Sequence, residues 1–276
     1  MTPTDRQPGG WKSYDSVVDA YERAAGPRFL QVAHDLVAAV GPPTDGRVLD
    51  VGTGTGIAGQ LALTDAGPDA FVVGVDPSVP MLERAVPRGL TVVAGLSPGL
   101  PFADGVFDAV LGNLVLSHIA DYALAVVDVA RVLHTGGRFG FTAWGPVATA
   151  SDEHQGPEAD KIVESIVASH DLDMAPAAPP VPSEDALRVR ENVENALRDA
   201  GLVDVDVQPR TYHWAYTVDQ YLVGREWRPG IRYIREQADP GLWQEIQNRA
   251  AAQLRDRFGD EIRTMGHMWL AAGTKP

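Results

Sequence analysis

Apolar residues recur with helical spacing along the first part of the chain. Tyr14, Val17, Val18 and Tyr21 share one face of a helix predicted over residues 11–21, and Phe29, Val32, Ala33, Leu36, Val37 and Val40 mark a second helix. Gly26-Pro27 separates the two predicted helices, and Gly41-Pro42-Pro43 ends the second one. Residues 1–10 are polar, so we expect an unstructured lead-in.

Short continuous apolar runs then alternate with helical patterns as far as Trp144. The predicted strands are residues 48–51, 71–75, 90–94, 107–111 and 139–143, and the predicted helices are residues 57–63, 79–86 and 122–133. Strands that are apolar on both faces and alternate with helices indicate a parallel sheet covered on both sides. The pattern therefore predicts an α/β fold of the doubly wound, Rossmann-like kind.

The pattern changes after Trp144. Residues 145–182 are polar and rich in alanine and proline, which is typical of a loop or lid, and one helix is predicted near 162–168. Further helices are predicted at 184–200 and over most of 217–260, and strands at 203–207 and 265–271. We therefore expect residues 11–144 to form the core and residues 145–276 to form a lid or cap that also completes the sheet, in one integrated domain.

The composition limits the partners and the compartment. The 276 residues carry 23 Lys and Arg against 37 Asp and Glu, for a formal net charge of −14. A surface this acidic repels phosphate backbones and anionic lipids, so nucleic acids and membranes are disfavoured as partners. Cysteine is absent, which excludes disulfides and thiolate metal sites and fits a reducing cytoplasm. Without a signal segment or a run of about 18 apolar residues, we expect a cytoplasmic protein, and a homodimer stays open.

The most informative stretch is Val48-Leu49-Asp50-Val51-Gly52-Thr53-Gly54-Thr55-Gly56. A strand runs into three alternate glycines and then into a helix, so a ligand can approach the backbone closely, beside the free N–H groups of the helix. This arrangement is typical of a nucleotide site at the carboxyl end of the first strand. The dinucleotide fingerprint G-x-G-x-x-G fails from Gly52, because Ile57 takes the third glycine position, and is met only in a shifted frame that starts at Gly54.

Further motifs follow in order along the chain. They are Val73-Gly74-Val75-Asp76-Pro77-Ser78, Leu100-Pro101-Phe102 with Asp104 and Phe107-Asp108, Leu111 to His118, and Leu133-His134-Thr135-Gly136-Gly137-Arg138. Together with the glycine loop, this succession over residues 14–144 resembles the class I S-adenosylmethionine-dependent methyltransferases, in particular the ubiquinone and menaquinone biosynthesis type that methylates small molecules. The resemblance implies a mostly parallel seven-stranded sheet, a helical lid and S-adenosylmethionine as the cofactor, with S-adenosylhomocysteine as its product.

The resemblance also implies which residues hold the cofactor. By their positions in the motifs they are Tyr14, Tyr21, Asp50, Gly52, Thr53, Gly54, Gly56, Asp76, Pro77, Met81, Leu96, Ser97, Asn113 and His118, with no metal. Asp76 is expected to accept hydrogen bonds from both ribose hydroxyls. Met81 is expected to pack on the adenine, although core packing is the more common role of a methionine. Leu96 stands where the family often has an acidic residue that holds the adenine amino group.

Catalytic and substrate candidates lie at and beyond the end of the fourth predicted strand. His118 is the candidate general base, because it follows that strand at the ligand-binding edge of the sheet; the alternative is a histidine that only packs or contacts the cofactor. Substrate contacts are expected from Trp144, His154, His213, Trp214 and Arg225, although each also fits a structural or solvated role. Arg225, Arg228, Arg232 and Arg235 recur at helical spacing and face either an anionic group or solvent.

The sequence therefore predicts an enzyme that methylates a small hydrophobic or aromatic molecule, of a natural-product or quinone-like type from secondary metabolism. Two alternatives stay open. One is a cyclase or binding protein that keeps the cofactor fold without methyl transfer, and the other is a nicotinamide-dependent oxidoreductase, which the shifted glycine match motivates. Gly95-Leu96-Ser97-Pro98-Gly99 matches the nucleophile elbow of hydrolases, but the prolines and glycine after Ser97 leave no helix to carry it.

Overall fold

The chain forms two compact units whose segments interleave along the sequence. This computed structural model describes residues 14, 15, 17–151, 153–170, 182–226, 231, 233–235 and 238–276. The sheet unit comprises Phe29–Pro146, Pro180–Arg210 and His267–Pro276, and the helical unit comprises Met1–Arg28, Val147–Pro179 and Thr211–Gly266.

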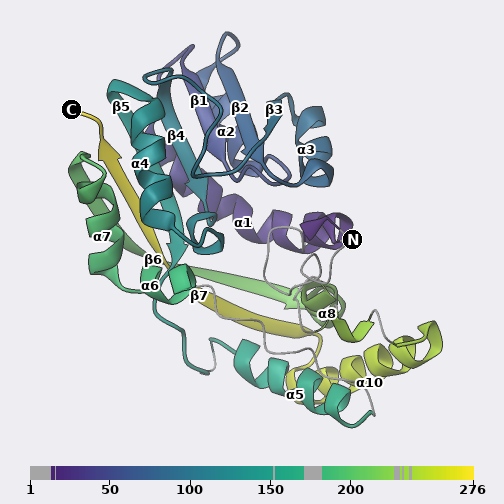
Figure 1. The fold of residues 1–276 in the computed structure, drawn as a ribbon. Helices are drawn as coiled ribbons and strands as arrows, with labels where there is room; N and C mark the ends of the chain where they lie inside the picture. Colours follow the sequence, from purple (N-terminus) through teal and green to yellow (C-terminus); the bar gives the residue numbers. More distant parts are fainter. Residues whose placement is uncertain are drawn as a thin grey trace. The chain divides into compact units, whose positions relative to one another are not determined.

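The sheet has seven strands in the order β3-β2-β1-β4-β5-β7-β6 among the described residues (Figure 1). The strands are β1 (Arg47–Val51), β2 (Phe71–Asp76), β3 (Thr91–Ala94), β4 (Phe107–Asn113), β5 (Leu133–Trp144), β6 (Val203–Thr217) and β7 (Glu261–Thr274). β1 pairs in parallel with β2 and β4, β2 with β3, and β4 with β5, whereas β7 is antiparallel to β5. The predicted doubly wound, mostly parallel seven-stranded sheet is therefore confirmed.

Helices cover both faces of the parallel strands (Figure 1). One face carries α1 (Val18–Val40), α2 (Ile57–Ala66) and α3 (Val79–Ala85), which is followed by the 3₁₀ turn η3 (Val86–Arg88), and the other face carries α4 (Tyr122–Val132) and α7 (Arg190–Asp199). Neighbouring residues of β1 belong to different hydrophobic cores. Leu49 packs with Val126 and Val129 of α4, whereas Val48 packs with Ala33 and Leu36 of α1. Burial on both faces explains why these strands are continuous apolar runs in the sequence.

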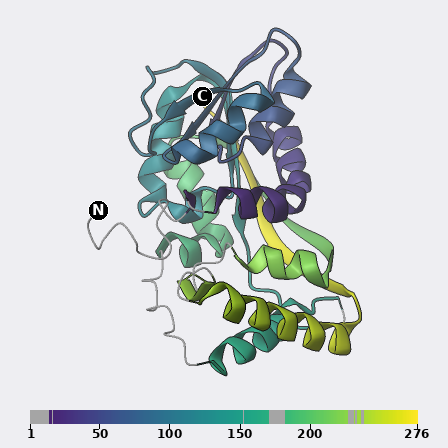
Figure 2. The ribbon, with the colours of Figure 1, turned by 90° about the vertical axis from the view of Figure 1, so that its right-hand side faces the viewer.

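The helical unit has a hydrophobic core of its own. α5 (Gly156–Ala168), α8 (Val218–Glu226) and α10 (Pro240–Phe258) pack together (Figure 2) around side chains that include Ile166, Tyr221, Leu254 and Ile262. The helices predicted over 217–260 are confirmed, and the helix predicted near 162–168 starts earlier, at Gly156. Among the described residues, no helix combines the length and the apolar character that crossing a membrane requires.

The break predicted at Gly26-Pro27 is wrong, because α1 runs without interruption from Val18 to Val40. A proline inside a helix removes one backbone hydrogen bond and crowds the preceding turn. Buried side chains lie on both sides of this point, among them Val18 and Phe29. Their burial offsets the local cost of the proline, which the sequence pattern alone does not reveal.

The single helix predicted over 184–200 is also wrong, because α6 (Pro182–Leu187) and α7 are separate helices. Val189 is extended at the start of α7, and Arg188 pairs with Glu184 of α6 at 3.1 Å and also bonds outside both helices. The Arg188 side chain donates to the Gly145 carbonyl at 3.0 Å, and the Arg188 carbonyl accepts from the Trp269 indole at 3.0 Å.

The strand predicted over 203–207 continues to Thr217, as β6, and includes Pro209. β6 is an edge strand of the sheet, and an edge strand tolerates a proline because its outer side needs no backbone N–H for pairing.

Candidate cofactor and active site

The glycine loop between β1 and α2 is shaped by left-handed backbone conformations. Gly52, Gly54 and Gly56 have φ angles of 64°, 53° and 88°. A Cβ atom on Gly52 would lie 2.1 Å from Cγ2 of Val115, so this glycine permits a close contact between the loop and the end of β4. A Cβ on Gly54 would meet no atom within 4 Å, so the loop presents bare backbone to open space at this position.

Asp50 supports the loop from inside the protein. Its side chain is 1% exposed, and Oδ2 accepts hydrogen bonds from the Thr53 hydroxyl at 2.7 Å and from the Gly59 N–H at 2.9 Å. Burial raises the pKa of Asp50 to about 7, although both hydrogen bonds act in the opposite direction. Asp50 and Thr53 therefore tie the loop to the start of α2, while the open space lies beside Gly54.

Asp76 ends β2 and meets the glycine loop. Its carboxylate accepts from the Gly54 N–H at 3.0 Å and from the Ser78 N–H at 2.9 Å, one bond to each oxygen. A carboxylate has about four acceptor positions, so an oriented group of this kind also accepts from ligand hydroxyls. Pro77 follows at the half-buried start of the turn into α3, where Met81 is only 3% exposed and packs in the interior.

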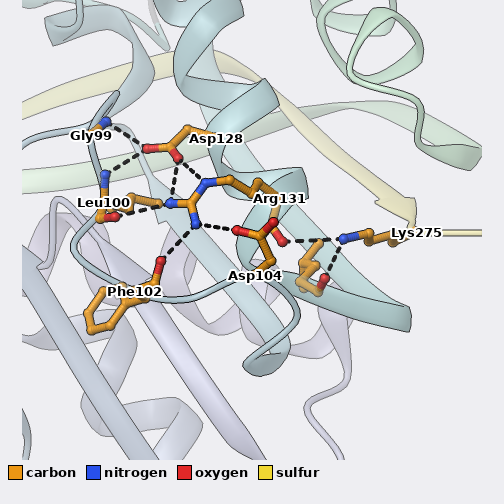
Figure 3. Close-up of polar contacts among 8 residues, drawn as sticks. Gly99, Leu100, Phe102, Asp104, Asp128, Arg131 and Lys275 are labelled. Atoms are coloured by element: carbon orange, nitrogen blue, oxygen red, sulfur yellow. Dashed lines mark hydrogen bonds and ion pairs between the residues drawn. The ribbon is translucent and has the colours of Figure 1, made fainter.

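The loop that follows β3 is held by Asp128 and Arg131 of α4 (Figure 3). The Asp128 carboxylate accepts from the backbone N–H groups of Gly99 and Leu100, both at 2.7 Å. The Arg131 guanidinium donates to the carbonyl oxygens of Leu100 at 3.0 Å and Phe102 at 2.7 Å, and to Asp128 at 2.9 Å. These bonds fix the stretch that carries the Leu-Pro-Phe motif.

Asp128 stays ionised in this arrangement. Burial alone would raise the pKa of Asp128, but the N–H groups of Leu100 and Gly99 and the guanidinium of Arg131 outweigh that effect and lower it. Just before the stretch that Asp128 and Arg131 hold, Leu96 is 52% exposed, while Ser97 is half-buried. The bonds of Asp128 and Arg131 therefore position an exposed apolar side chain at the place where the resemblance puts the adenine ring.

The end of β4 carries Asn113 and a strained residue. Asn113 Oδ1 accepts from the Thr142 hydroxyl at 2.8 Å, and that hydroxyl accepts from the Leu114 N–H at 3.0 Å. Leu114 has a φ of 56°, a conformation that non-glycine residues rarely adopt and that clusters at functional sites. The same turn places Val115 against Gly52, so the end of β4 and the glycine loop lie together.

His118 closes the 3₁₀ turn η4 (Leu116–His118), which follows this edge. Its side chain is exposed, yet the surrounding protein disfavours the charged form and lowers the pKa of His118, with Glu184 of α6 acting in the opposite direction. α6 lies against η4, and the Ser183 hydroxyl donates to the Ser117 carbonyl at 3.3 Å. A lowered pKa favours the neutral imidazole, which is the form that a general base requires.

Two hydroxyls in the sheet unit are buried without a partner among the described residues. They are Oγ1 of Thr55, in the glycine loop, and Oγ of Ser97, in the loop after β3. Buried hydroxyls of this kind indicate a missing partner. With the open backbone at Gly54, the oriented carboxylate of Asp76 and the exposed Leu96, they form a donor and acceptor set that fits a nucleoside with a polar tail, as in S-adenosylmethionine.

The aromatic candidates Tyr14, Tyr21, His213 and Trp214 belong to the helical unit. Tyr14 and Tyr21 meet edge to face, with ring centroids 5.7 Å apart. Trp214 stacks on Tyr212 at 6.1 Å, whereas His213 is exposed. Their role toward a cofactor or an acceptor stays a prediction.

Two of the predicted substrate residues have structural partners inside the helical unit. His154 Nδ1 accepts from the Met265 N–H at 3.0 Å, which ties the loop before α5 to β7. Arg225 is 8% exposed, pairs with Asp160 at 2.5 Å and lies 3.9 Å from the centre of the Tyr221 ring. The solvated alternative is therefore wrong for Arg225.

The remaining candidates divide between the two units. Trp144 ends β5 in the sheet unit and meets Phe29 edge to face at 6.3 Å. Arg235 pairs with Glu226 at 3.1 Å in the helical unit. The prediction for Arg228 and Arg232 lies outside the described residues.

Sequence reasoning missed Asp128, Arg131, Thr142 and Glu184. The spacing of three between Asp128 and Arg131 on one helix face was a usable signal for an ion pair. Thr142 and Glu184 gave no such signal, because their partners lie 29 and 66 residues away in the chain.

Comparison with known proteins agrees with this geometry. Residues 49–141 match the family model described as a methyltransferase domain. A demethylmenaquinone methyltransferase of Roseiflexus sp. (strain RS-1) is 42% identical over 104 residues, which cover 36% of this chain and 43% of that protein. The chain thus matches less than half the length of that relative.

Two further similarities extend over most of the chain. Nocamycin O-methyltransferase of Saccharothrix syringae is 27% identical over 237 residues, 82% of this chain and 84% of that protein. The solved structure of Haemonchus contortus phosphoethanolamine N-methyltransferase 2 in complex with S-adenosyl-L-methionine superposes with a TM-score of 0.57 at 21% identity, over 95% of this chain and 57% of that one. The structural similarity shows a shared fold.

Proposed function

We propose that the protein transfers a methyl group from S-adenosylmethionine to a small molecule, because residues 49–141 match a methyltransferase domain and the motifs over residues 14–144 resemble the class I S-adenosylmethionine-dependent family. The observation that carries the proposal is the pairing of Asp76 with the glycine loop, where an oriented carboxylate lies beside bare backbone at Gly54. The family resemblance and the matched relatives favour methyl transfer over a nicotinamide-dependent oxidoreductase or a cyclase.

The acceptor that we propose is a hydrophobic or aromatic compound of the natural-product or quinone-like type. The similarity to demethylmenaquinone and nocamycin methyltransferases supports this class, and the second extends beyond the matched domain into most of the chain. A cytoplasmic location and the exclusion of nucleic acid are predictions from composition, and the acidic charge of −14 supports the exclusion of nucleic acid. A homodimer stays an open possibility.

When bound, the cofactor supplies a methyl group on a positively charged sulfur, which is the reactive part of the chemistry. The protein has to orient both reactants, and orientation of this kind lowers a barrier by up to about 7–11 kcal/mol. Asp76 and the glycine loop would hold the nucleoside end, and Leu96 would contact the adenine. His118 would accept the proton of an acceptor hydroxyl, because its lowered pKa favours the neutral form and its side chain is exposed in the turn that follows β4.

The test is calorimetric titration of the purified protein with S-adenosylmethionine and S-adenosylhomocysteine, with NADH as the control ligand. We expect micromolar binding of the two sulfur compounds alone. Asp76→Ala should weaken that binding about 10- to 150-fold, through lost hydrogen bonds to a charged group. Asp69→Ala is the matched control, since Asp69 is exposed in the loop that leads into the same strand, and it should bind as the unmodified protein does.

Two results would contradict the proposal. Selective binding of NADH would favour the oxidoreductase alternative. Equal affinities of Asp76→Ala and Asp69→Ala for the sulfur compounds would exclude Asp76 as the residue that binds the ribose. Methyl transfer itself is checked by mass spectrometry, as an acceptor from a panel of quinols and phenols that gains the mass of one methylene group.

A further inference from the structure

The loop that follows β3 continues directly beside Asp76, within the sheet unit. Asp76 is opposite Ala94 in the parallel register of β2 and β3, and the Gly95 N–H donates to the Asp76 carbonyl at 3.2 Å. β1 and its glycine loop lie on the other side of β2, where the Gly54 N–H donates to the Asp76 carboxylate at 3.0 Å. A nucleoside whose ribose is held by Asp76 therefore has the glycine loop on one side and Leu96 on the other.

The carboxylate that contacts this loop has no acceptor position left for a nucleobase (Figure 3). Oδ2 of Asp128 accepts from the N–H groups of Gly99 and Leu100, both at 2.7 Å. Oδ1 of Asp128 is bonded to Nε and Nη2 of Arg131 at 2.9 and 2.8 Å. A carboxylate has about four acceptor positions, and these four contacts occupy them.

An apolar side chain and one hydroxyl are what the loop itself offers to a base. Residues 95–102 contain no acidic or amide side chain, and Asp104, which follows them, pairs with Arg131 and has a side chain that is 78% exposed. Leu96 is 52% exposed. Oγ of Ser97 is shielded from solvent and has no hydrogen-bond partner among the described residues, which indicates a partner that is still to bind.

These two groups differ from a carboxylate in how they select a base. A carboxylate only accepts hydrogen bonds, so it pairs with an amino group and repels an oxo group. A hydroxyl can turn to accept from the first or to donate to the second, and a leucine side chain pairs with neither. Strong discrimination requires a polar partner that one of the two ligands leaves unpaired, and Leu96 and Ser97 do not supply such a partner.

We propose that the sheet unit holds the cofactor's base through apolar contact with Leu96 and a hydrogen bond to the Ser97 hydroxyl, and that it therefore also accepts a purine with an oxo group in place of the adenine amino group. That the ligand is this cofactor rests on the proposed function. The proposed function requires only that the adenine form binds, whereas the inference concerns the selectivity for its base.

The experiment is calorimetric titration with S-adenosylhomocysteine and S-inosylhomocysteine, whose purines carry an amino and an oxo group, respectively. Both compounds lack the positive charge on sulfur, so a new carboxylate acts on the base and not on that charge. Leu96→Asp introduces a carboxylate, and Leu96→Asn removes the same apolar contact without adding a charge. Leu30→Asp is the matched control, because Leu30 of α1 belongs to the same unit and is 50% exposed.

We expect the unmodified protein to bind the two compounds with dissociation constants within about tenfold of each other. Leu96→Asp should shift their ratio in favour of S-adenosylhomocysteine by about 10- to 150-fold, through a hydrogen bond to a charged group. Leu96→Asn and Leu30→Asp should leave the ratio unchanged, since an amide both donates and accepts. Ser97→Ala should weaken both compounds alike, by about 2- to 10-fold.

Three results would overturn the inference. They are a preference of the unmodified protein for S-adenosylhomocysteine of more than about tenfold, a ratio in Leu96→Asp that moves no more than in Leu30→Asp, and unchanged affinities in Ser97→Ala. Binding of S-adenosylhomocysteine with exclusion of S-inosylhomocysteine would remove the inference and leave the proposed function intact. Binding of neither compound would remove the proposed function and the inference together.

Discussion

Replacement of Gly54 by alanine separates the shape of the loop from its contact with a ligand. Gly54 has a φ of 53°, and a Cβ there would meet no atom of the protein within 4 Å. The loss of folding stability in Gly54→Ala should therefore be the backbone cost of placing a residue with a side chain in the left-handed conformation, about 1–2 kcal/mol. Gly41 offers a matched control, because its φ is 60° and its Cβ would also meet nothing within 4 Å.

The two variants should differ in ligand binding. If the cofactor lies against the Gly54 backbone, the new methyl group overlaps it at a cost of about 1–3 kcal/mol, which raises the dissociation constant about 5- to 150-fold. Gly41→Ala has the same backbone penalty at the end of α1 and should leave the affinity unchanged.

The assay combines urea unfolding with calorimetric titration by S-adenosylhomocysteine. Both variants should lose a similar free energy of unfolding, and only Gly54→Ala should lose affinity. Equal affinities would refute the inference that the ligand approaches the bare backbone at this position. A much larger loss of stability in Gly54→Ala than in Gly41→Ala would refute the inference that the space beside Gly54 is open.

Three further predictions concern buried and clamping groups. Asp50→Asn keeps an oxygen for the Thr53 and Gly59 donors but cannot ionise. Because burial raises the pKa of Asp50 to about 7, ionisation destabilises the unmodified protein as pH rises from about 4 to 7, so in urea unfolding the stability of the variant relative to the unmodified protein should be higher at about pH 8 than at about pH 5. The rate of methyl transfer should fall on acidification as His118 becomes protonated, at a lower pH than for an ordinary histidine because the pKa of His118 is lowered, and a pH–rate profile unchanged in His118→Ala would exclude it as the base. Arg131→Ala should lose about 1.5–3 kcal/mol of stability in urea unfolding, through its bonds to the loop after β3, whereas Arg190→Ala, in an exposed pair with Glu194, should lose less than about 1 kcal/mol.

The sequence determined the parallel part of the fold and the location of the cofactor loop. Strands buried on both faces appear as continuous apolar runs, and a strand followed by alternate glycines needs no distant partner to be recognised. Asp76 could be predicted for the same reason, because it ends a strand that must lie beside the first one. These features depend on neighbours within a few residues, which is the range that a sequence pattern records.

Only the tertiary structure decided what the buried polar groups do. Arg225 looked like part of a solvated face, but its partner Asp160 lies 65 residues earlier in the chain. The helix break at Arg188 depends on the indole of Trp269, 81 residues away, and the continuity of α1 through Pro27 depends on burial along both of its halves. Such outcomes follow from long-range contacts whose free energy exceeds local propensity, so no local pattern predicts them.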